Sequence, residues 1–135
     1  NVELLLDYCL RFYDRQFFSR ANLNSDTMAK FERLLINYYK SDQANQNGLP
    51  SVEFCAKQLN LSPNYLSDLL RRETGKTALE HIHYFLMEKA KNRLLNSSET
   101  ISRIAYSLGF EYPQHFSNLF KSKTGLSPTE YRRLN

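Results

Sequence analysis

The chain carries the same helix–turn–helix pattern twice, about fifty residues apart. The first copy covers residues 51–75 and the second covers residues 100–125. Each copy has a short apolar helix, a tight turn, a proline and a second helix that ends in Thr-Gly. The apolar positions correspond one to one: Val52, Cys55, Ala56, Leu59, Leu66, Leu69 and Leu70 match Ile101, Ile104, Ala105, Leu108, Phe116, Leu119 and Phe120. Two such modules on one short chain suit a long partner with periodic binding sites.

Positive charge is concentrated in the part of the chain that carries the repeat. Residues 1–48 hold six basic and six acidic side chains, whereas residues 49–135 hold twelve and eight, so the second segment carries the whole net charge of +4. A basic surplus on a binding module favours a polyanionic partner such as DNA. An ordinary solvated surface would account equally well for the charge by itself.

The sequence pattern predicts helices along the whole chain. Its four glycines and four prolines fall at element boundaries, and no alternating strand pattern of useful length occurs. The sequence predicts an all-α fold in which two helix–turn–helix subdomains are joined by a long linker helix, with an N-terminal helical arm. The expected segments are an arm over 1–24 and a DNA-binding domain over 25–135, which contains a helix at 27–40, a polar loop at 41–50, a first helix–turn–helix at 51–73, a linker helix at 77–95, a second helix–turn–helix at 100–123 and a closing helix at 128–134.

The arm has apolar residues on nearly every side of its helix, more than one buried stripe requires. We therefore expect it to pack against another domain of a longer regulator, or against a second copy of the chain as a homodimer. A polar break at 22–26 separates it from the next helix, with Ser25 or Asp26 as the N-cap.

Local signals mark the turns and helix ends. Asn60 and Gly109 stand at the centres of the two tight turns, and both residue types tolerate positive φ. Thr-x-x-Glu and Ser-x-x-Glu capping boxes open helices at Thr77 and Ser127. Cys55 aligns with an isoleucine of the second copy and is expected in the core.

The second helix of each copy has a polar outer face. Hydrogen-bonding side chains come early on these helices and cations come later, which suits a helix lying in a major groove. The linker helix of nineteen residues spans roughly 28 Å, and successive major grooves on one face of B-DNA lie about 34 Å apart. One chain could therefore reach two adjacent grooves.

The second copy and the closing helix resemble the signature of the AraC/XylS family of bacterial transcription regulators. The residues that carry the resemblance are Ile104, Ala105, Gly109, Phe110, Phe116, Phe120, Lys121, Gly125, Pro128, Tyr131 and Arg132. The resemblance covers about residues 27–135 and is weaker in the first copy. It implies a seven-helix DNA-binding domain that acts at promoters in the bacterial cytoplasm, often as an activator that touches RNA polymerase.

By position in this family, residues 63–73 and 113–123 are the base-reading helices. The resemblance implies base contacts from Asn64, Ser67, Asp68, Gln114, Ser117 and Asn118, and phosphate contacts from Ser62, Arg71, Arg72, Lys76, His115, Lys121 and Lys123. Glutamine and asparagine pair with adenine, and aspartate accepts a hydrogen bond from cytosine. Family members often have arginine where Asp68 and Asn118 stand, so we expect less guanine reading here.

Little in the sequence supports a function in catalysis, metal binding or membrane insertion. No nucleophile–base constellation, phosphate loop, metal-ligand spacing or membrane-spanning stretch is visible, so we expect no enzyme activity, no cofactor, no metal and no membrane partner. Two cysteines without a pairing pattern favour a reducing compartment, here the cytoplasm. The alternative to a DNA-binding regulator is a helical protein-interaction module that has lost DNA binding.

Overall fold

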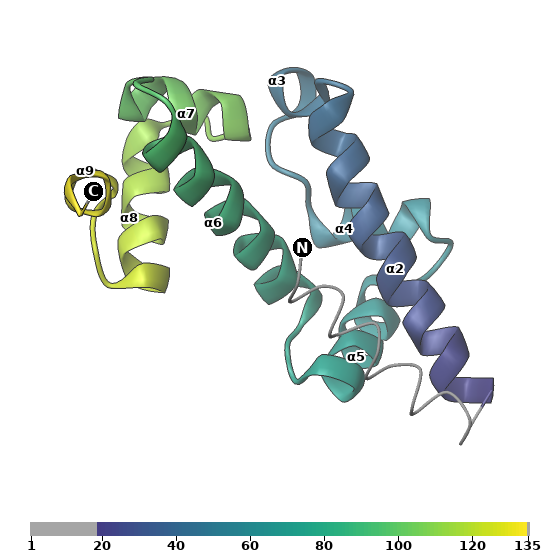
Figure 1. The fold of residues 1–135 in the computed structure, drawn as a ribbon. Helices are drawn as coiled ribbons and strands as arrows, with labels where there is room; N and C mark the ends of the chain where they lie inside the picture. Colours follow the sequence, from purple (N-terminus) through teal and green to yellow (C-terminus); the bar gives the residue numbers. More distant parts are fainter. Residues whose placement is uncertain (1–18, 135) are drawn as a thin grey trace.

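The computed structural model of the protein describes residues 19–134, with side chains from residue 26 onward. Within that range every regular element is an α-helix, which confirms the predicted fold class (Figure 1). The helices are α2 (Ser19–Lys40), α3 (Gln43–Asn47), α4 (Val52–Gln58), α5 (Pro63–Thr74), α6 (Ala78–Asn96), α7 (Ile101–Leu108), α8 (Pro113–Thr124) and α9 (Pro128–Arg133).

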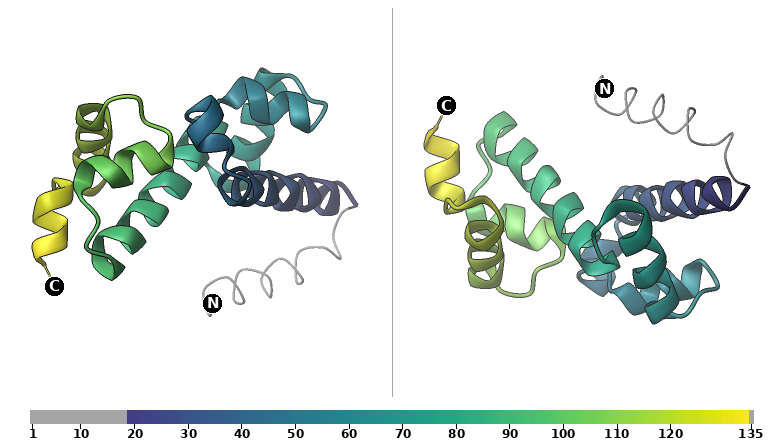
Figure 2. Two further views of the ribbon diagram at one scale, coloured as in Figure 1. Left: turned by 90° about the horizontal axis from the view of Figure 1, so that it is seen from above. Right: turned by 90° about the horizontal axis from the view of Figure 1, so that it is seen from below.

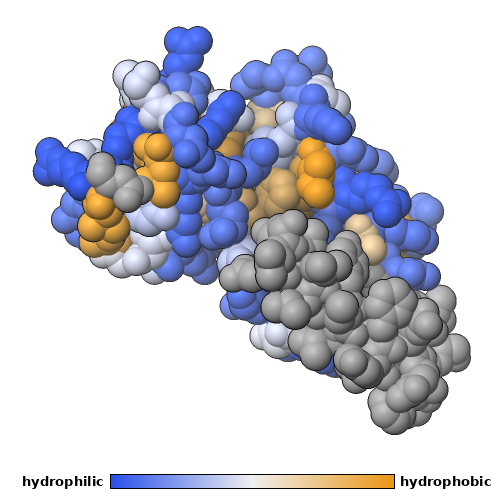
Figure 3. Space-filling view, viewed as in Figure 1, coloured by the Kyte–Doolittle hydropathy of each residue, from blue (hydrophilic) through white to orange (hydrophobic). Residues whose placement is uncertain are grey.

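The long helix α6 lies between two groups of helices. Helices α2 to α5 form the first unit on one side of it, and α7 to α9 form the second unit on the other side (Figures 1 and 2). One apolar core runs through both units, with fully buried side chains such as Phe31 of α2, Leu86 of α6 and Phe116 of α8. The surface seen in Figure 3 is mostly hydrophilic, with apolar side chains in small separate patches.

The capping boxes predicted at Thr77 and Ser127 and the two predicted tight turns are confirmed. Ser51 accepts a hydrogen bond from a backbone N–H in the first turn of α4. The capping boxes at Thr77 and Ser127 are both formed, because in each the side chains and backbone N–H groups of the two residues bond reciprocally. Asn60 has φ 60° and Gly109 has φ 104°, so both turns use the left-handed backbone that their residue types allow.

Cys55 is fully buried, as the repeat predicts. Burial raises the pKa of its thiol to about 11, so the group stays protonated and behaves as a small apolar side chain. Among the residues that the structure describes, no three histidine, cysteine or acidic side chains are grouped as metal ligands. No helix within residues 19–134 is long and apolar enough to cross a bilayer.

The expected break at 22–26, with an N-cap at Ser25 or Asp26, is wrong. Helix α2 runs without interruption from Ser19 to Lys40 and so crosses the expected boundary between arm and domain. Asn, Ser and Asp each cost at most about 0.7 kcal/mol in a helix interior, and extending a helix that is already nucleated is cheap. The part of α2 that packs on the core therefore stabilises the helix, and the polar segment 22–26 continues it.

The interval 41–50 is not wholly a loop. The five-residue helix α3 forms inside it and buries Ala44. With α3 the described residues contain eight helices, one more than the seven that the family resemblance implied. The expected linker and closing helices are each correct to within one or two residues. Most of the arm, and with it the expected homodimer contact, lies outside the described residues.

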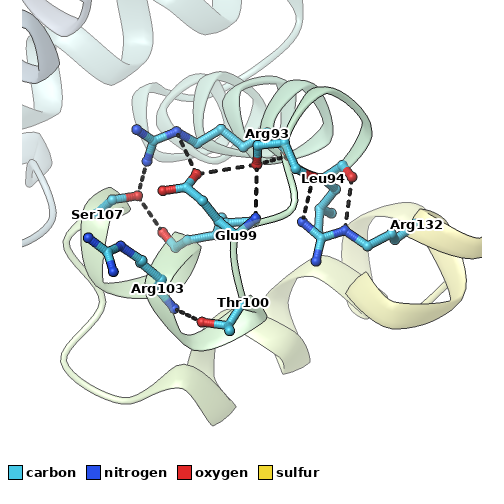
Figure 4. A network of polar contacts seen from close by, with 9 residues as sticks. Arg93, Leu94, Glu99, Thr100, Arg103, Ser107 and Arg132 are labelled. Atoms are coloured by element: carbon cyan, nitrogen blue, oxygen red, sulfur yellow. Dashed lines mark hydrogen bonds and ion pairs between the residues drawn. The ribbon is translucent and has the colours of Figure 1, made fainter.

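A polar network fixes the C-terminal end of α6 to the second unit (Figure 4). Arg132 of α9 donates from Nε to the carbonyl oxygen of Leu94 at 2.9 Å and from Nη2 to that of Ser97 at 3.3 Å. Arg93 of α6 forms an ion pair with Glu99 at 3.8 Å and bonds Ser107 of α7. The last carbonyls of a helix have no partner inside it and carry partial negative charge, so a cation is favourable here.

Replacing Arg132 with alanine should lower the free energy of unfolding by about 1–3 kcal/mol, because it leaves the carbonyl oxygens at the end of α6 without their cationic donor. Urea denaturation measures the loss. Its neighbour Arg133 is exposed, and Arg133→Ala is the matched control with an expected change within about 0.5 kcal/mol. Equal losses in the two variants would contradict the capping role.

Candidate nucleic-acid interface

Helix α5 is held by its inner face and leaves its polar face in solvent. Leu66, Leu69 and Leu70 are buried against the core. Ser62 caps the helix by accepting a hydrogen bond from the Tyr65 N–H at 3.1 Å. Because a hydroxyl can accept and donate together, the Ser62 O–H remains able to donate to a phosphate oxygen.

The outer face of α5 presents the candidates that the sequence predicted. Asn64, Asp68, Arg71 and Arg72 are exposed, and Ser67 is half-buried. The Arg72 Nε donates at 3.4 Å to the backbone carbonyl of Asp68, not to its carboxylate. No ion pair joins the Asp68 carboxylate to Arg71 or Arg72 in the part of the chain that the structure describes. The carboxylate is therefore available to a donor on a base edge.

Helix α8 repeats this arrangement in the second unit. Phe116 and Phe120 are fully buried, whereas Gln114, Asn118 and Lys121 are exposed. The Gln114 Nε2 donates to the Asn118 Oδ1 at 2.9 Å, so the two amides are already aligned on one face of the helix. This bond leaves the Gln114 carbonyl oxygen and the Asn118 amino group free, which are an acceptor and a donor for a base pair.

The start of α8 differs from the start of α5. Its N-cap residue is Tyr112, whose side chain makes no capping hydrogen bond. The Tyr112 ring is exposed and meets the His115 ring edge-on, with centroids 5.4 Å apart. Tyr112 thus adds an exposed hydroxyl beside His115 at the helix N-terminus. Tyr112 was not among the predicted contacts, although its place directly before Pro113 was a usable signal.

The C-terminal ends of α5 and α8 meet the same side of α6. A groove of about 260 Å³ is lined by Lys76, Glu80, Tyr84, Met87, Glu88, Lys91, Lys123 and Thr124. Lys76 follows α5, and Lys123 lies in the last turn of α8. The Lys76 Nζ lies 4.8 Å from the centre of the Tyr84 ring. Two predicted phosphate contacts, one from each unit, therefore converge at one place.

Two carboxylates also lie in this groove. Hydrogen bonds from Thr77 lower the pKa of Glu80, with smaller contributions from Lys123 and Lys76, so Glu80 remains ionised. Glu88 pairs with Lys91 at 3.2 Å on the exposed surface. The presence of Lys91 and Tyr84 here was not foreseen, because nothing in the pattern of α6 shows which of its faces borders α8.

The thirteen predicted DNA contacts all reach the surface to some degree. Ser67 and Ser117 are half-buried, and the exposed ones are Ser62, Asn64, Asp68, Arg71, Arg72, Lys76, Gln114, His115, Asn118, Lys121 and Lys123. The structure brings Gln114 together with Asn118, and Lys76 together with Lys123. The assignment of each residue to a base or a phosphate stays a prediction.

Comparison with known sequences identifies relatives among transcription regulators. A family profile described as a helix-turn-helix domain matches residues 55–134. YesN of Bacillus subtilis, described as an uncharacterized transcriptional regulatory protein, is 35% identical over 95 residues, which are 67% of this chain and 26% of YesN. RhaS of Escherichia fergusonii, described as a transcriptional activator, is 35% identical over 83 residues, which are 62% of this chain and 30% of RhaS. The chain thus matches less than a third of the length of either relative.

Solved structures share the fold. The C-terminal domain of AraT, a response regulator from Geobacillus stearothermophilus, aligns with a TM-score of 0.66 at 31% identity and covers 78% of this chain and 85% of that one. The DNA-binding domain of AdpA, solved with a target DNA, aligns with a TM-score of 0.64 over 77% of this chain and 90% of that one, and at 20% identity it supports the fold alone. By its repeated motif, its turns and these matches, the chain belongs to the AraC/XylS family of transcription regulators and has the fold of that family's DNA-binding domain.

Proposed function

We propose that this protein is a sequence-specific DNA-binding regulator in which α5 and α8 enter two adjacent major grooves of one duplex. The observation that carries the proposal is the convergence of Lys76 and Lys123, which brings the ends of both helices to the same side of α6. Helices that faced opposite sides of the linker could not reach one face of a duplex. Their exposed polar faces supply the donors and acceptors that base edges and phosphates require.

In both helices, separate groups of residues contact bases and phosphates. The early side chains Asn64, Ser67, Asp68, Gln114, Ser117 and Asn118 read base edges, while Ser62, Arg71, Arg72, Lys76, His115, Lys121 and Lys123 contact phosphates. The aligned amides of Gln114 and Asn118 favour adenine, whose N6 donor and N7 acceptor match a side-chain amide. The unpaired Asp68 carboxylate favours the cytosine N4 donor.

Selection of binding sites from randomised duplexes tests the proposal. We expect enrichment of a two-part sequence whose parts are about one helical turn apart, 10–10.5 base pairs. Absence of duplex binding at about 50 mM salt, where phosphate contacts are strong, would favour the helical protein-interaction module instead.

Replacing Gln114 with alanine should relax the preference at one base pair of the selected site, at a cost of about 1–3 kcal/mol on the preferred base. The amide is lost, and Asn118 loses its aligned partner. Competition binding against the four variants of each base pair measures the effect. Ser122 is exposed on the same helix and outside the predicted set, so Ser122→Ala is the control. If the base preference at every position were unchanged, Gln114 would not be one of the residues that contact bases.

We also infer that the regulator activates transcription through contact with RNA polymerase. Support comes from the relatives named RhaS, which are described as transcriptional activators. The chain matches only 30–38% of their length, so the inference concerns a regulator that contains this domain. Transcription in vitro from a promoter bearing the selected site should rise on adding the protein with RNA polymerase. A fall in transcript would make the protein a repressor at that promoter.

A further inference from the structure

The two units also touch one another directly, in addition to packing on the linker helix. The turn that follows α3 in the first unit packs against the end of α7 in the second unit (Figure 1). Four residues of this contact are here called the clasp: Tyr39, Gly48, Leu108 and Gly109. None of them belongs to the predicted DNA contacts.

Tyr39 joins three parts of the molecule. Its hydroxyl, on the first unit, donates to the Leu108 carbonyl oxygen of the second unit at 2.7 Å. Its ring stacks on Phe85 of α6, with centroids 5.8 Å apart and planes at 30°. The Leu108 carbonyl is among the last of α7 and has no acceptor role inside the helix, so the tyrosine satisfies it. Burial raises the pKa of Tyr39, which keeps the hydroxyl protonated as a donor.

Gly48 and Gly109 bring the two backbones together. A Cβ atom on Gly109 would lie 2.7 Å from the carbonyl carbon of Gly48 and 2.9 Å from the Leu49 nitrogen, closer than real side chains come. Tyr38 fixes this turn from the other side, because its hydroxyl donates to the Gly48 carbonyl oxygen at 2.7 Å. The approach is therefore backbone against backbone, with no flexible side chain that could yield.

The repeat shows that the helix–turn–helix turn alone does not require glycine. Asn60 occupies the position in the first copy that Gly109 occupies in the second, and it is exposed with φ 60°. Asparagine therefore satisfies the turn where no neighbour is present. What excludes a side chain at position 109 is the first unit of the molecule.

We propose that the clasp fixes the distance and rotation between α5 and α8, and so sets the half-site spacing that the protein accepts. The spacing part rests on the function proposed above. Both units pack on α6, so bending or twisting of that helix would move one unit against the other. A second contact away from the helix axis resists both motions. The four clasp residues are positioning residues and touch no DNA.

Binding to duplexes of varied half-site spacing tests the consequence for recognition. Tyr39→Phe removes one hydrogen bond and keeps the ring, whereas Gly109→Asn keeps a turn-compatible residue and obstructs the approach. In Tyr39→Phe, the preference for the optimal spacing over one changed by two base pairs should fall about fivefold, the worth of one hydrogen bond. In Gly109→Asn the same preference should also fall, because the added side chain meets the backbone of Gly48 and Leu49. Binding to a duplex with a single half-site should stay within about twofold. Tyr106 is an exposed tyrosine of α7, and Tyr106→Phe should retain the parent profile.

A distance measurement tests the clasp without DNA. Spin labels on cysteines introduced at the exposed positions Glu73 and Ser122, in a Cys9→Ser background, report the separation of the ends of α5 and α8. We expect one narrow distance distribution in the parent and a broader or shifted one in Tyr39→Phe and Gly109→Asn.

The two experiments separate failure of the clasp from failure of the proposed function. Unchanged distributions in both variants, or an unchanged spacing preference in both, would overturn the clasp. If the parent binds no duplex, the proposed function fails, and the label distances alone decide whether the clasp holds the units.

Discussion

Replacing Gly109 with valine should lower the free energy of unfolding by about 2–6 kcal/mol. A β-branched residue at positive φ costs about 1–3 kcal/mol, and Gly109 has φ 104°. Forcing atoms into a filled space costs about another 1–3 kcal/mol, and the backbone of Gly48 and Leu49 fills that space here. Thermal and urea denaturation measure the total loss.

Gly75 provides the matched control for this substitution. It also ends a helix at positive φ, 82°, but apart from its neighbours along the chain no atom lies within 4 Å of the position of its Cβ. Gly75→Val should therefore cost only the backbone strain of about 1–3 kcal/mol. The difference between the two variants measures the contact between units. Equal losses would mean that the close approach of Gly48 and Gly109 contributes nothing to stability.

The affinity for a selected duplex should fall about 500-fold between about 50 and 200 mM salt. Five cations are predicted to contact phosphates: Arg71, Arg72, Lys76, Lys121 and Lys123. Each phosphate contact releases counterions and contributes about −0.9 to the slope of log K against log salt, so five give a slope of about −4.5. Fluorescence anisotropy over a salt series measures it. A slope near zero would contradict a phosphate-binding interface.

Replacing Lys121 with alanine should flatten that slope by about 0.9 and weaken binding equally on every sequence. Lys40 is also exposed but lies at the end of α2, outside the predicted interface, so Lys40→Ala should leave the slope unchanged. A loss that depended on sequence would instead make Lys121 a base contact. An unchanged slope would remove it from the phosphate set.

Features that depend on a few neighbouring residues were predictable from the sequence. Ser51 and Thr77 cap their helices with side chains that bond a backbone N–H three residues on, and Asn60 makes its turn because its residue type tolerates positive φ. The inner faces of α5 and α8 follow from the spacing of their apolar residues. The remaining positions of these two helices cannot face the core and therefore face solvent. This is why the predicted contacts all lie at the surface.

Sequence patterns failed where local preference was weak. The segment 22–26 looked like a break because Asn, Ser and Asp favour caps and turns, yet it continues α2. Similarly, α3 forms in a polar stretch because the burial of Ala44 supplies stability that propensity does not. Both errors arose where helix propensity is small compared with packing.

By itself, the sequence determined two helix–turn–helix units, their linker, their caps and the polar faces of their second helices, because each of these is encoded within a few residues. Only the tertiary structure decided that Tyr39 reaches Leu108, that Gly48 meets Gly109, and that Lys76 lies in one groove with Lys123. These contacts join residues 47 to 69 positions apart. They depend on how whole helices pack around α6, which no short-range periodicity specifies.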